Sequence, residues 1–172
     1  MAILRILQYP DLRLRSKSYM VDDVKSEKIK KIISDMLETL GNTENCAALA
    51  ATQLDIQRPP SIVVINPMCS DGAEICLVNP RIISQEGRDV AKEGCMSIFL
   101  GDDIYVKVER SAKIGVEAIN ANGKKIKFEA EGFLARCIQH ECDHLNGILY
   151  IDHLSKLKRS LLEKKILKLS RK

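Results

Sequence analysis

The sequence QHECDH at residues 139–144 decides how the rest of the chain is interpreted, because it places His140 and His144 four residues apart with Glu141 between them. On an α-helix, residues four apart lie on the same face, about 6 Å apart along the axis, so both imidazoles can reach one metal ion. Glu141 is then close enough to move the protons of a reacting water molecule. The chain has only three histidines, so this pattern favours a metal site over two ordinary helical histidines.

The spacing of apolar residues around this segment predicts the helix itself. Leu134, Cys137, Ile138 and Leu145 recur at intervals that are typical of one helical face. Asn146-Gly147 follows directly, and a glycine after a helical run is a common C-terminal stop. The two histidines are therefore expected on one face of a helix that ends near residue 145.

The length and composition are those of an ordinary globular protein. The 172 residues fit a single domain, residues 1–172, which is large enough to bury a sizeable core. Apolar residues make up 45% of the chain and charged residues 29%, both usual for this class. No run approaches the roughly 18 apolar residues of a membrane helix, and the N-terminus lacks the apolar segment of a signal peptide. These features predict a cytoplasmic protein without membrane contact.

Cysteine spacing argues against disulfides. The six cysteines, at positions 46, 69, 76, 95, 137 and 142, match no disulfide framework and include no C-x-x-C pair. A chain of this length does not need disulfides for stability. The thiols are expected to be reduced and mostly buried as small hydrophobic side chains.

The net charge of +4 is concentrated at the C-terminus. Residues 155–172 carry eight Lys or Arg and one acid, so the rest of the chain is near −3. This segment is expected to form a basic C-terminal helix. Because the basicity is local, the fold as a whole is not expected to bind nucleic acid.

Periodicity along the chain predicts helices and short strands. A helical stripe runs over residues 26–40 and ends at Gly41, and a second stripe runs over residues 154–169 with a basic outer face. Alternating or continuous apolar runs, two of them closed by Asn-Pro and two joined by an Asn-Gly turn, predict strands. These strands are expected at 61–66, 75–78, 81–84, 104–108, 113–119 and 126–130.

These elements together predict an α+β fold. We expect short antiparallel or mixed sheets packed around a central metal-binding helix, with an N-terminal helix and a basic C-terminal helix. The small residues of segment 46–53 indicate tight packing.

A third metal ligand is needed, because a catalytic metal usually takes three protein ligands and leaves one position for water. The third histidine of a metzincin pattern would fall at Tyr150, which excludes that pattern. Glu163 could serve as in thermolysin-like proteases, but it lies among Leu and Lys, where a salt bridge is the commoner role. Cys95, after the conformationally free Gly94, is the other candidate. Spacing alone leaves the choice open, since a lone Cys is by default a buried hydrophobic residue.

Three segments in the same order resemble the peptide deformylase family: LAATQ at Leu49–Gln53, EGCMS at Glu93–Ser97 and QHECDHLNG at Gln139–Gly147. The resemblance runs from the Tyr-Pro-Asp near residue 9 to Leu154, nearly the whole chain. It implies hydrolysis of the N-formyl group from the initiator methionine of nascent polypeptides, with release of formate.

The resemblance also implies the metal ligands. Cys95, His140 and His144 would hold one divalent metal ion, Fe(II) in the cell, with Zn(II) or Ni(II) tolerated. A thiolate with two imidazoles suits these metals.

The catalytic groups implied by the resemblance surround these ligands. Glu141 would take a proton from the attacking water and deliver it to the departing amine. The side-chain amide of Gln53 and the backbone N–H of Met96 would donate to the developing oxyanion. Gln139 and Asp143 would orient the ligands, as residues behind a metal site commonly do.

The substrate cleft is where the sequence departs from the family. Cys46 and Ala48 replace two glycines at which the family's backbone closely approaches substrate, and packing is the expected role of Cys46. Arg136 replaces an apolar residue, and a cation suits a methionine pocket poorly unless it turns outward or pairs with an acid. Phe99 replaces a proline. We therefore expect a weaker or altered preference for formyl-methionine. The implied cleft residues are Ala47, Ala48, Leu49, Phe133, Arg136 and Cys137.

Partners and alternatives complete the expectations. The basic tail is a candidate contact for ribosomal RNA through phosphate attraction, while a solvated helix that covers the core explains it equally well. A zinc peptidase stays an alternative, with the missing third histidine against it. A non-catalytic metal-binding or ribosome-associated protein is another, with the presence of Glu141 and Gln53 against it.

Overall fold

The structure, a computed structural model, describes residues 2–69, 72, 74–98 and 104–169. Phe99, one of the departures from the family pattern, lies outside these residues. The helices are α1 (Glu27–Gly41), α2 (Gly132–Leu145) and α3 (Lys156–Leu169), and the 3₁₀ turns are η1 (Leu12–Arg15), η2 (Ala51–Gln53), η3 (Pro67–Cys69), η4 (Met96–Ile98) and η6 (Tyr150–His153). The strands are β1 (Ala48–Ala50), β2 (Ile62–Ile65), β3 (Ile75–Glu86), β4 (Asp89–Glu93), β5 (Val106–Arg110), β6 (Lys113–Ile119) and β7 (Lys125–Glu131).

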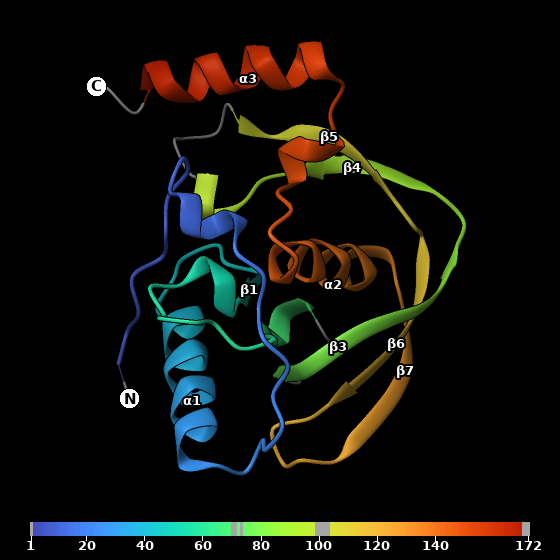
Figure 1. Cartoon of the computed structure of the whole chain (residues 1–172). Helices are drawn as coiled ribbons and strands as arrows, with labels where there is room; N and C mark the ends of the chain where they lie inside the picture. The colour runs from blue at the N-terminus through green and yellow to red at the C-terminus, as the bar shows by residue number, and fades with distance from the viewer. Residues whose placement is uncertain (1, 70–71, 73, 99–103, 170–172) are drawn as a thin grey trace.

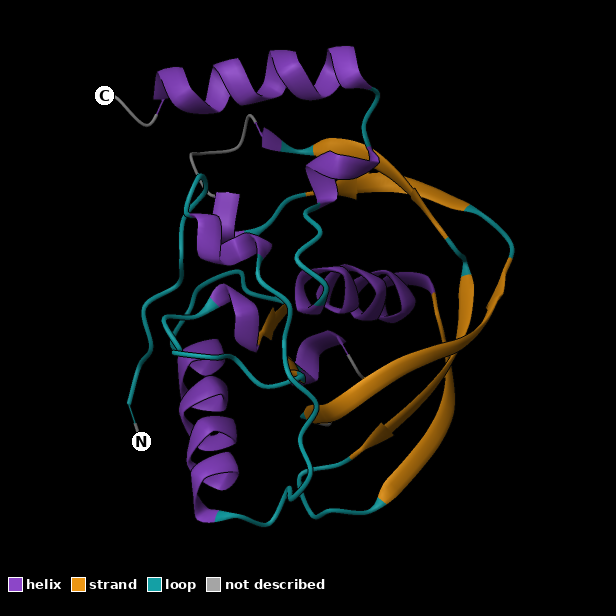
Figure 2. Ribbon diagram, in the orientation of Figure 1, coloured by secondary structure: helices purple, strands orange, loops and turns teal. Residues whose placement is uncertain are grey.

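Two sheets surround α2, as Figures 1 and 2 show. One has five strands in the order β1-β2-β3-β6-β7, and the other pairs β4 with β5. All of these pairings are antiparallel. In Figure 1, α2 lies in the middle, with α1 below it and α3 across the top. The predicted α+β architecture around a central helix is therefore confirmed.

Helix α1 forms where the helical stripe predicted it. Ile29, Ile33, Met36 and Leu40 are buried on one face and share a core cluster with β2. Ser26 precedes the helix in an extended conformation. Burial of such a stripe is the main source of helical stability in a folded protein. This helix supports β1 and β2 from the side away from α2.

Helix α2 lies between the five-stranded sheet and the part of the chain that forms β4, β5 and η6 (Figure 1). Ala135, Ile138 and Leu145 are buried in the core cluster that includes β2, β3 and β6. The helix stops at Asn146-Gly147, as predicted. Gly147 has a φ of +73°, and a Cβ there would collide with the backbone carbonyl of Arg15, so glycine is required for both reasons.

Strand β3 corrects the prediction that Asn79-Pro80 ends a strand. The segments 75–78 and 81–84 belong to one strand, and the register against β6 shifts between Val78 and Arg81. Asn79 takes a φ of +52° within this bulge. Its side chain accepts a hydrogen bond from the Val21 N–H (2.9 Å) and donates one to the Val21 carbonyl (2.8 Å). A bulge lets a strand pass a residue that cannot pair regularly, such as proline.

Other elements also differ from the sequence prediction, and strand β1 forms where the small residues of segment 46–53 predicted only tight packing. Strand β4 was not expected, because its short sequence DVAKE has only two apolar residues and gives a weak alternation signal. In α3 only part of the apolar stripe is covered. Leu162 and Ile166 are buried, but Leu157 and Leu161 are 71% and 59% exposed. The helix contacts the core along a narrow line, so the predicted amphipathic packing is only partly correct.

Two negative findings concern the membrane and the thiols. Among the described helices, none combines the length and the apolar character needed to cross a membrane. All six cysteines are free, as expected from their spacing.

The bulge at Asn79 gives a stability prediction. Asn79→Gly removes the two hydrogen bonds to Val21 but tolerates the positive φ, so the free energy of unfolding should fall by about 2 kcal/mol. Asn79→Ala also places alanine in the left-handed region, which should cost about 1 kcal/mol more. Urea unfolding of both variants measures the difference, and an alanine variant as stable as the glycine variant would contradict this account.

Candidate active site

Three side chains from distant parts of the chain meet above β1. His140 and His144 lie on α2, and Cys95 lies in the link between β4 and η4. The Cys95 Sγ is 3.2 Å from the His144 Nε2, which is 3.2 Å from the His140 Nε2. All three potential ligand atoms lie within 4.8 Å of one another. The structure thus brings together the two candidate histidines and the mid-chain cysteine.

The donor set fits a divalent metal of the zinc or iron type. Bonds of about 2.0–2.3 Å to nitrogen and sulfur place tetrahedral ligand atoms roughly 3.5 Å apart, close to the observed separations. His144 is buried, and burial lowers the pKa of its imidazole well below the usual value, an effect that the nearby positive charge of Arg110 reinforces. A neutral imidazole is the form that binds a metal. Three protein ligands leave a position open for substrate or water.

Glu93 fixes the orientation of His140. The His140 Nδ1 lies 3.0 Å from the Glu93 Oε2. Because a carboxylate only accepts, Nδ1 carries the proton and Nε2 presents its lone pair to the metal position. Burial acts to raise the pKa of Glu93, but the hydrogen bonds from His140 and Arg110 outweigh it and hold that pKa below its usual range. Glu93 is therefore ionised.

Two arginines neutralise Glu93 inside the protein. The Arg110 guanidinium donates to both carboxylate oxygens, at 2.7 Å and 3.0 Å. The Arg136 Nη1 donates to the Glu93 Oε1 at 2.5 Å, and its Nη2 donates to Asp89 at 2.8 Å. Side chains of Glu93, Arg110 and Arg136 are all at most 6% exposed. Desolvated charges of this kind are tolerated only when they are paired and hydrogen-bonded.

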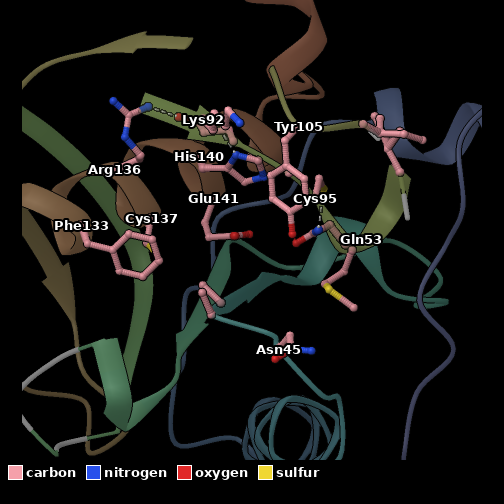
Figure 3. Close-up of a pocket in the computed structure, with 17 residues that line it drawn as sticks. Asn45, Gln53, Lys92, Cys95, Tyr105, Phe133, Arg136, Cys137, His140 and Glu141 are labelled. Atoms are coloured by element: carbon pink, nitrogen blue, oxygen red, sulfur yellow. Dashed lines mark hydrogen bonds and ion pairs between the residues drawn. The ribbon is translucent and has the colours of Figure 1, made fainter. Parts of the chain in front are cut away.

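Glu141 lies beside the histidines with a free carboxylate oxygen. The residue is 4% exposed, and its Oε2 has no hydrogen-bond partner among the described residues. Burial raises the pKa of Glu141 to about 7, although the nearby positive charge of Arg110 opposes this. A carboxyl group with a pKa near neutral can both take up and release a proton. The free oxygen is thus suited to proton transfer in the cleft (Figure 3).

Gln53 presents its amide nitrogen to the same point. Its Oε1 accepts a hydrogen bond from the Ala50 N–H (2.8 Å), which leaves the Nε2 facing the Cys95 Sγ (3.5 Å) and the Ser97 Oγ (3.3 Å). Met96 follows Cys95 at the start of η4, and its carbonyl is held by the Gln8 side chain. Gln53 is buried, so its position is fixed before any substrate arrives.

A cleft of about 210 Å³ opens onto these groups. Of the predicted substrate-contact residues, Leu49 is an exception: its side chain is 0% exposed and packs in the core cluster with α1. Successive side chains of a strand point to opposite sides, so Ala48 lines the cleft while Leu49 faces away. The predicted residues that do line the cleft are Ala47, Ala48, Phe133, Arg136 and Cys137.

Arg136 does not bring a free cation into the cleft. Figure 3 shows its guanidinium turned away from Glu141, toward the contacts with Glu93 and Asp89. Its carbon chain is the part that borders the cleft, which is a common use of long basic side chains. Cys46 does not narrow the cleft either, because it is buried and its Sγ faces the Ala48 carbonyl. Burial raises the pKa of Cys46 to about 12, as expected for a packing residue.

The predicted orienting residues act differently from expectation. The side chain of Gln139 accepts a hydrogen bond from the Ser111 N–H (3.0 Å) and donates one to the Ser111 carbonyl (2.9 Å). It is therefore directed at the backbone of Ser111 and not at the imidazole of His140 or His144. Asp143 accepts from Arg110 and pairs with His153, each at 2.7 Å. Asp143 therefore reaches His140 only through Arg110 and Glu93. Motif spacing cannot reveal such a chain, because its members come from β4, β5 and α2.

Sequence reasoning missed Glu93 as the direct partner of His140, although it opens the EGCMS segment. A signal was available, since an acid just before a candidate ligand is a common partner of a ligating histidine. No local sequence pattern predicted that Arg110 would pair with Glu93 and Asp143. The alternative ligand Glu163 is engaged elsewhere: the Tyr9 hydroxyl donates to it (3.2 Å), and so does Arg159 (2.9 Å).

Comparisons with known proteins agree with this geometry. A family model described as polypeptide deformylase matches residues 3–160. Peptide deformylase 1 of Coxiella burnetii is 47% identical over 167 residues, 97% of this chain and 96% of that protein. A crystal structure of peptide deformylase from Ehrlichia chaffeensis in complex with actinonin matches with a TM-score of 0.87 and 34% identity over the full length of both chains. One from Legionella pneumophila gives 0.85 and 37% over 99% of this chain and 96% of that one. The chain belongs to the peptide deformylase family of metal-dependent hydrolases.

Proposed function

We propose that the Cys95–His140–His144 cluster is the catalytic centre at which this chain hydrolyses the N-formyl group of nascent formyl-methionyl polypeptides and releases formate. The observation that carries the assignment is the convergence of one thiol and two imidazole nitrogens within 4.8 Å at the floor of a cleft. Peptide deformylase 1 of Coxiella burnetii, 47% identical over 97% of this chain, supports the reaction.

Each residue around the cluster receives a role in this proposal. Cys95, His140 and His144 would hold the metal, which when bound supplies a Lewis acid that polarises the formyl group and acidifies the attacking water. Glu141 accepts the proton of that water and passes it to the departing amine, using the carboxylate oxygen that has no hydrogen-bond partner among the described residues. Gln53 donates from its fixed Nε2 to the oxygen on which negative charge develops, and the Met96 backbone N–H is assigned the second donation.

The ligand residues support an assignment of the metal, and the free thiols support an assignment of the cellular compartment. A thiolate with two imidazoles suits Fe(II), Zn(II) and Ni(II), and we assign Fe(II) as the metal in the cell, with the other two as substitutes. Nascent formylated chains are made in the bacterial cytoplasm, and six free thiols suit that reducing compartment. We therefore place the protein in the cytoplasm.

The cleft supports an ordinary preference for formyl-methionine. The expected change in specificity depended on three departures from the family pattern, at Cys46 and Ala48, at Arg136 and at Phe99. For one of them, Arg136, the charge pairs with Glu93 and Asp89 instead of entering the pocket. The other predicted residues that line this part of the cleft include Ala47, Phe133 and Cys137. An apolar surface of this kind suits the flexible thioether side chain of methionine.

The basic helix α3 is proposed to contact ribosomal RNA near emerging chains. Its lysines, among them Lys158, Lys164 and Lys168, are exposed, and such side chains attract phosphates in a salt-dependent way.

The role of Glu141 is tested by substitution. Glu141→Ala and the isosteric Glu141→Gln should lower kcat for formate release from a formyl-Met peptide by about 10²–10⁴-fold, because the proton-transfer group is lost. Metal content, measured on anaerobically purified protein, should stay at one ion per chain. Retained turnover in both variants would exclude Glu141 as the proton carrier.

Glu93 is predicted to control both stability and metal affinity. Glu93→Ala leaves Arg110 and Arg136 buried without their shared anion, so the free energy of unfolding should fall by about 3–5 kcal/mol. Loss of the His140 partner should also weaken metal binding by about 10–100-fold in chelator competition. The matched control is Asp89→Asn, which removes only the outer partner of Arg136 and should leave metal affinity unchanged. Equal losses of metal affinity in the two variants would refute the orienting role.

The ribosome contact predicts a tail-specific salt dependence. Replacing Lys158, Lys164 and Lys168 with Gln should weaken ribosome co-sedimentation and reduce its salt slope by up to about 0.9 per lost phosphate contact. The control replaces three lysines elsewhere, Lys28, Lys124 and Lys125, and should bind as the unaltered protein does. Co-sedimentation that persists unchanged in the tail variant would exclude this role for α3.

A further inference from the structure

The two-stranded sheet beside the cleft carries an unusual pair of like charges. Lys92 on β4 lies directly opposite Lys107 on β5 in the antiparallel register. Both residues are exposed, and directly opposed residues share one face of a sheet. Like charges in this arrangement repel and destabilise the pairing. The sheet therefore carries a local cost that no fold requirement explains.

These lysines also differ from the other cations of the same strands and of the turn that precedes β4. Arg110 pairs with Glu93 and Asp143, and Arg88 pairs with Glu109. Neither Lys92 nor Lys107 forms an ion pair within the part of the chain that the structure describes. Two neighbouring ammonium groups without an anion create a positive potential on this edge of the cleft.

The two lysines lie beside the cleft that the substrate would occupy. Lys92 lines the cleft together with Gly94 and Tyr105, and Figure 3 shows Lys92 and Tyr105 along the same side of the site, opposite Asn45. The Tyr105 ring rests on Gly94, since a Cβ added to Gly94 would lie 2.6 Å from the ring. Tyr105 is 52% exposed, so one face of a rigid aromatic ring is available next to the lysines.

We propose that Lys92 and Lys107, with Tyr105 beside them, form a carboxylate-recognition site for the polypeptide that follows formyl-methionine. The inference rests on the proposed deformylase function and adds a sequence preference to it. A formyl-methionine in the cleft must send the rest of its chain out along the cleft walls, and β4 with Tyr105 is one of these walls. An Asp or Glu side chain within the next few residues would neutralise the opposed lysines and relieve their repulsion.

The test compares charged and neutral peptides of the same shape. Formyl-Met-Ala-Ala-Ala amide is varied with Asp or Asn at position 2, 3 or 4, and kcat/KM is measured for each. At one position at least, Asp should exceed Asn by about two- to fivefold, the range expected for exposed ion pairs. The gain should lie in KM rather than kcat, and it should shrink as the salt concentration rises because exposed charges are screened.

Variants assign the effect to the pair. In Lys92→Gln/Lys107→Gln the Asp-to-Asn ratio should fall to one, while thermal stability does not decrease. The matched control Lys125→Gln, on β7, should keep the ratio of the unaltered protein. An equal Asp-to-Asn ratio in the double variant and the unaltered protein would overturn the inference.

A ratio of one in the unaltered protein would also overturn it. The inference is also overturned if the Asp-to-Asn ratio is one in the unaltered protein and exceeds one only in an Asp102→Asn/Asp103→Asn variant. In that case the chain's own carboxylates, and not those of the substrate, would neutralise the two lysines. If no peptide is hydrolysed, the deformylase proposal fails separately. Calorimetric Kd values for the Asp and Asn peptides in a Glu141→Ala background still measure the preference in that event.

Discussion

The buried carboxylate of Glu93 is the interaction on which this active site depends. One side chain at the end of β4 accepts from His140 on α2, from Arg110 on β5 and from Arg136 on α2. It therefore connects the small sheet to the central helix and fixes the tautomer of a proposed metal ligand at the same time. A buried anion is stable only with such partners, so the fold and the site constrain each other here.

The same network explains how the chain accommodates an arginine beside the cleft. Arg136 adds a second cation to Glu93 and is itself satisfied by Asp89 and the Val108 carbonyl. Its polar end is thereby kept out of the cleft, and only its carbon chain borders the substrate space. The cost of burying one more charge is offset by several short hydrogen bonds.

The cleft combines a buried floor of fixed side chains with an exposed edge. Gln53, Glu141 and the histidines are buried and held by hydrogen bonds or close packing. Lys92 and Tyr105 are exposed at the edge, where substitutions cost little stability. In the proposed function the reacting groups therefore lie on this rigid floor, and the proposed selectivity for the following residues lies at the exposed edge.

The sequence by itself determined the elements whose signals are local. The i, i+4 histidines, the helical stripes over 26–40 and 134–145 and the alternation at 113–119 each depend on residues close in the chain, so periodicity could predict them. The three motifs in order were enough to indicate the family. The Asn-Gly turn and the stop at Gly147 were readable for the same reason.

Only the tertiary structure decided which distant groups meet. Spacing could not choose Cys95 over Glu163, pair Glu93 with two arginines, or carry β3 through Asn79-Pro80, because each outcome depends on contacts between separate strands and helices. It also decided that Leu49 faces the core and that Leu157 and Leu161 stay exposed. Local patterns specify which face of an element is apolar, while the three-dimensional packing determines which neighbour, if any, covers that face.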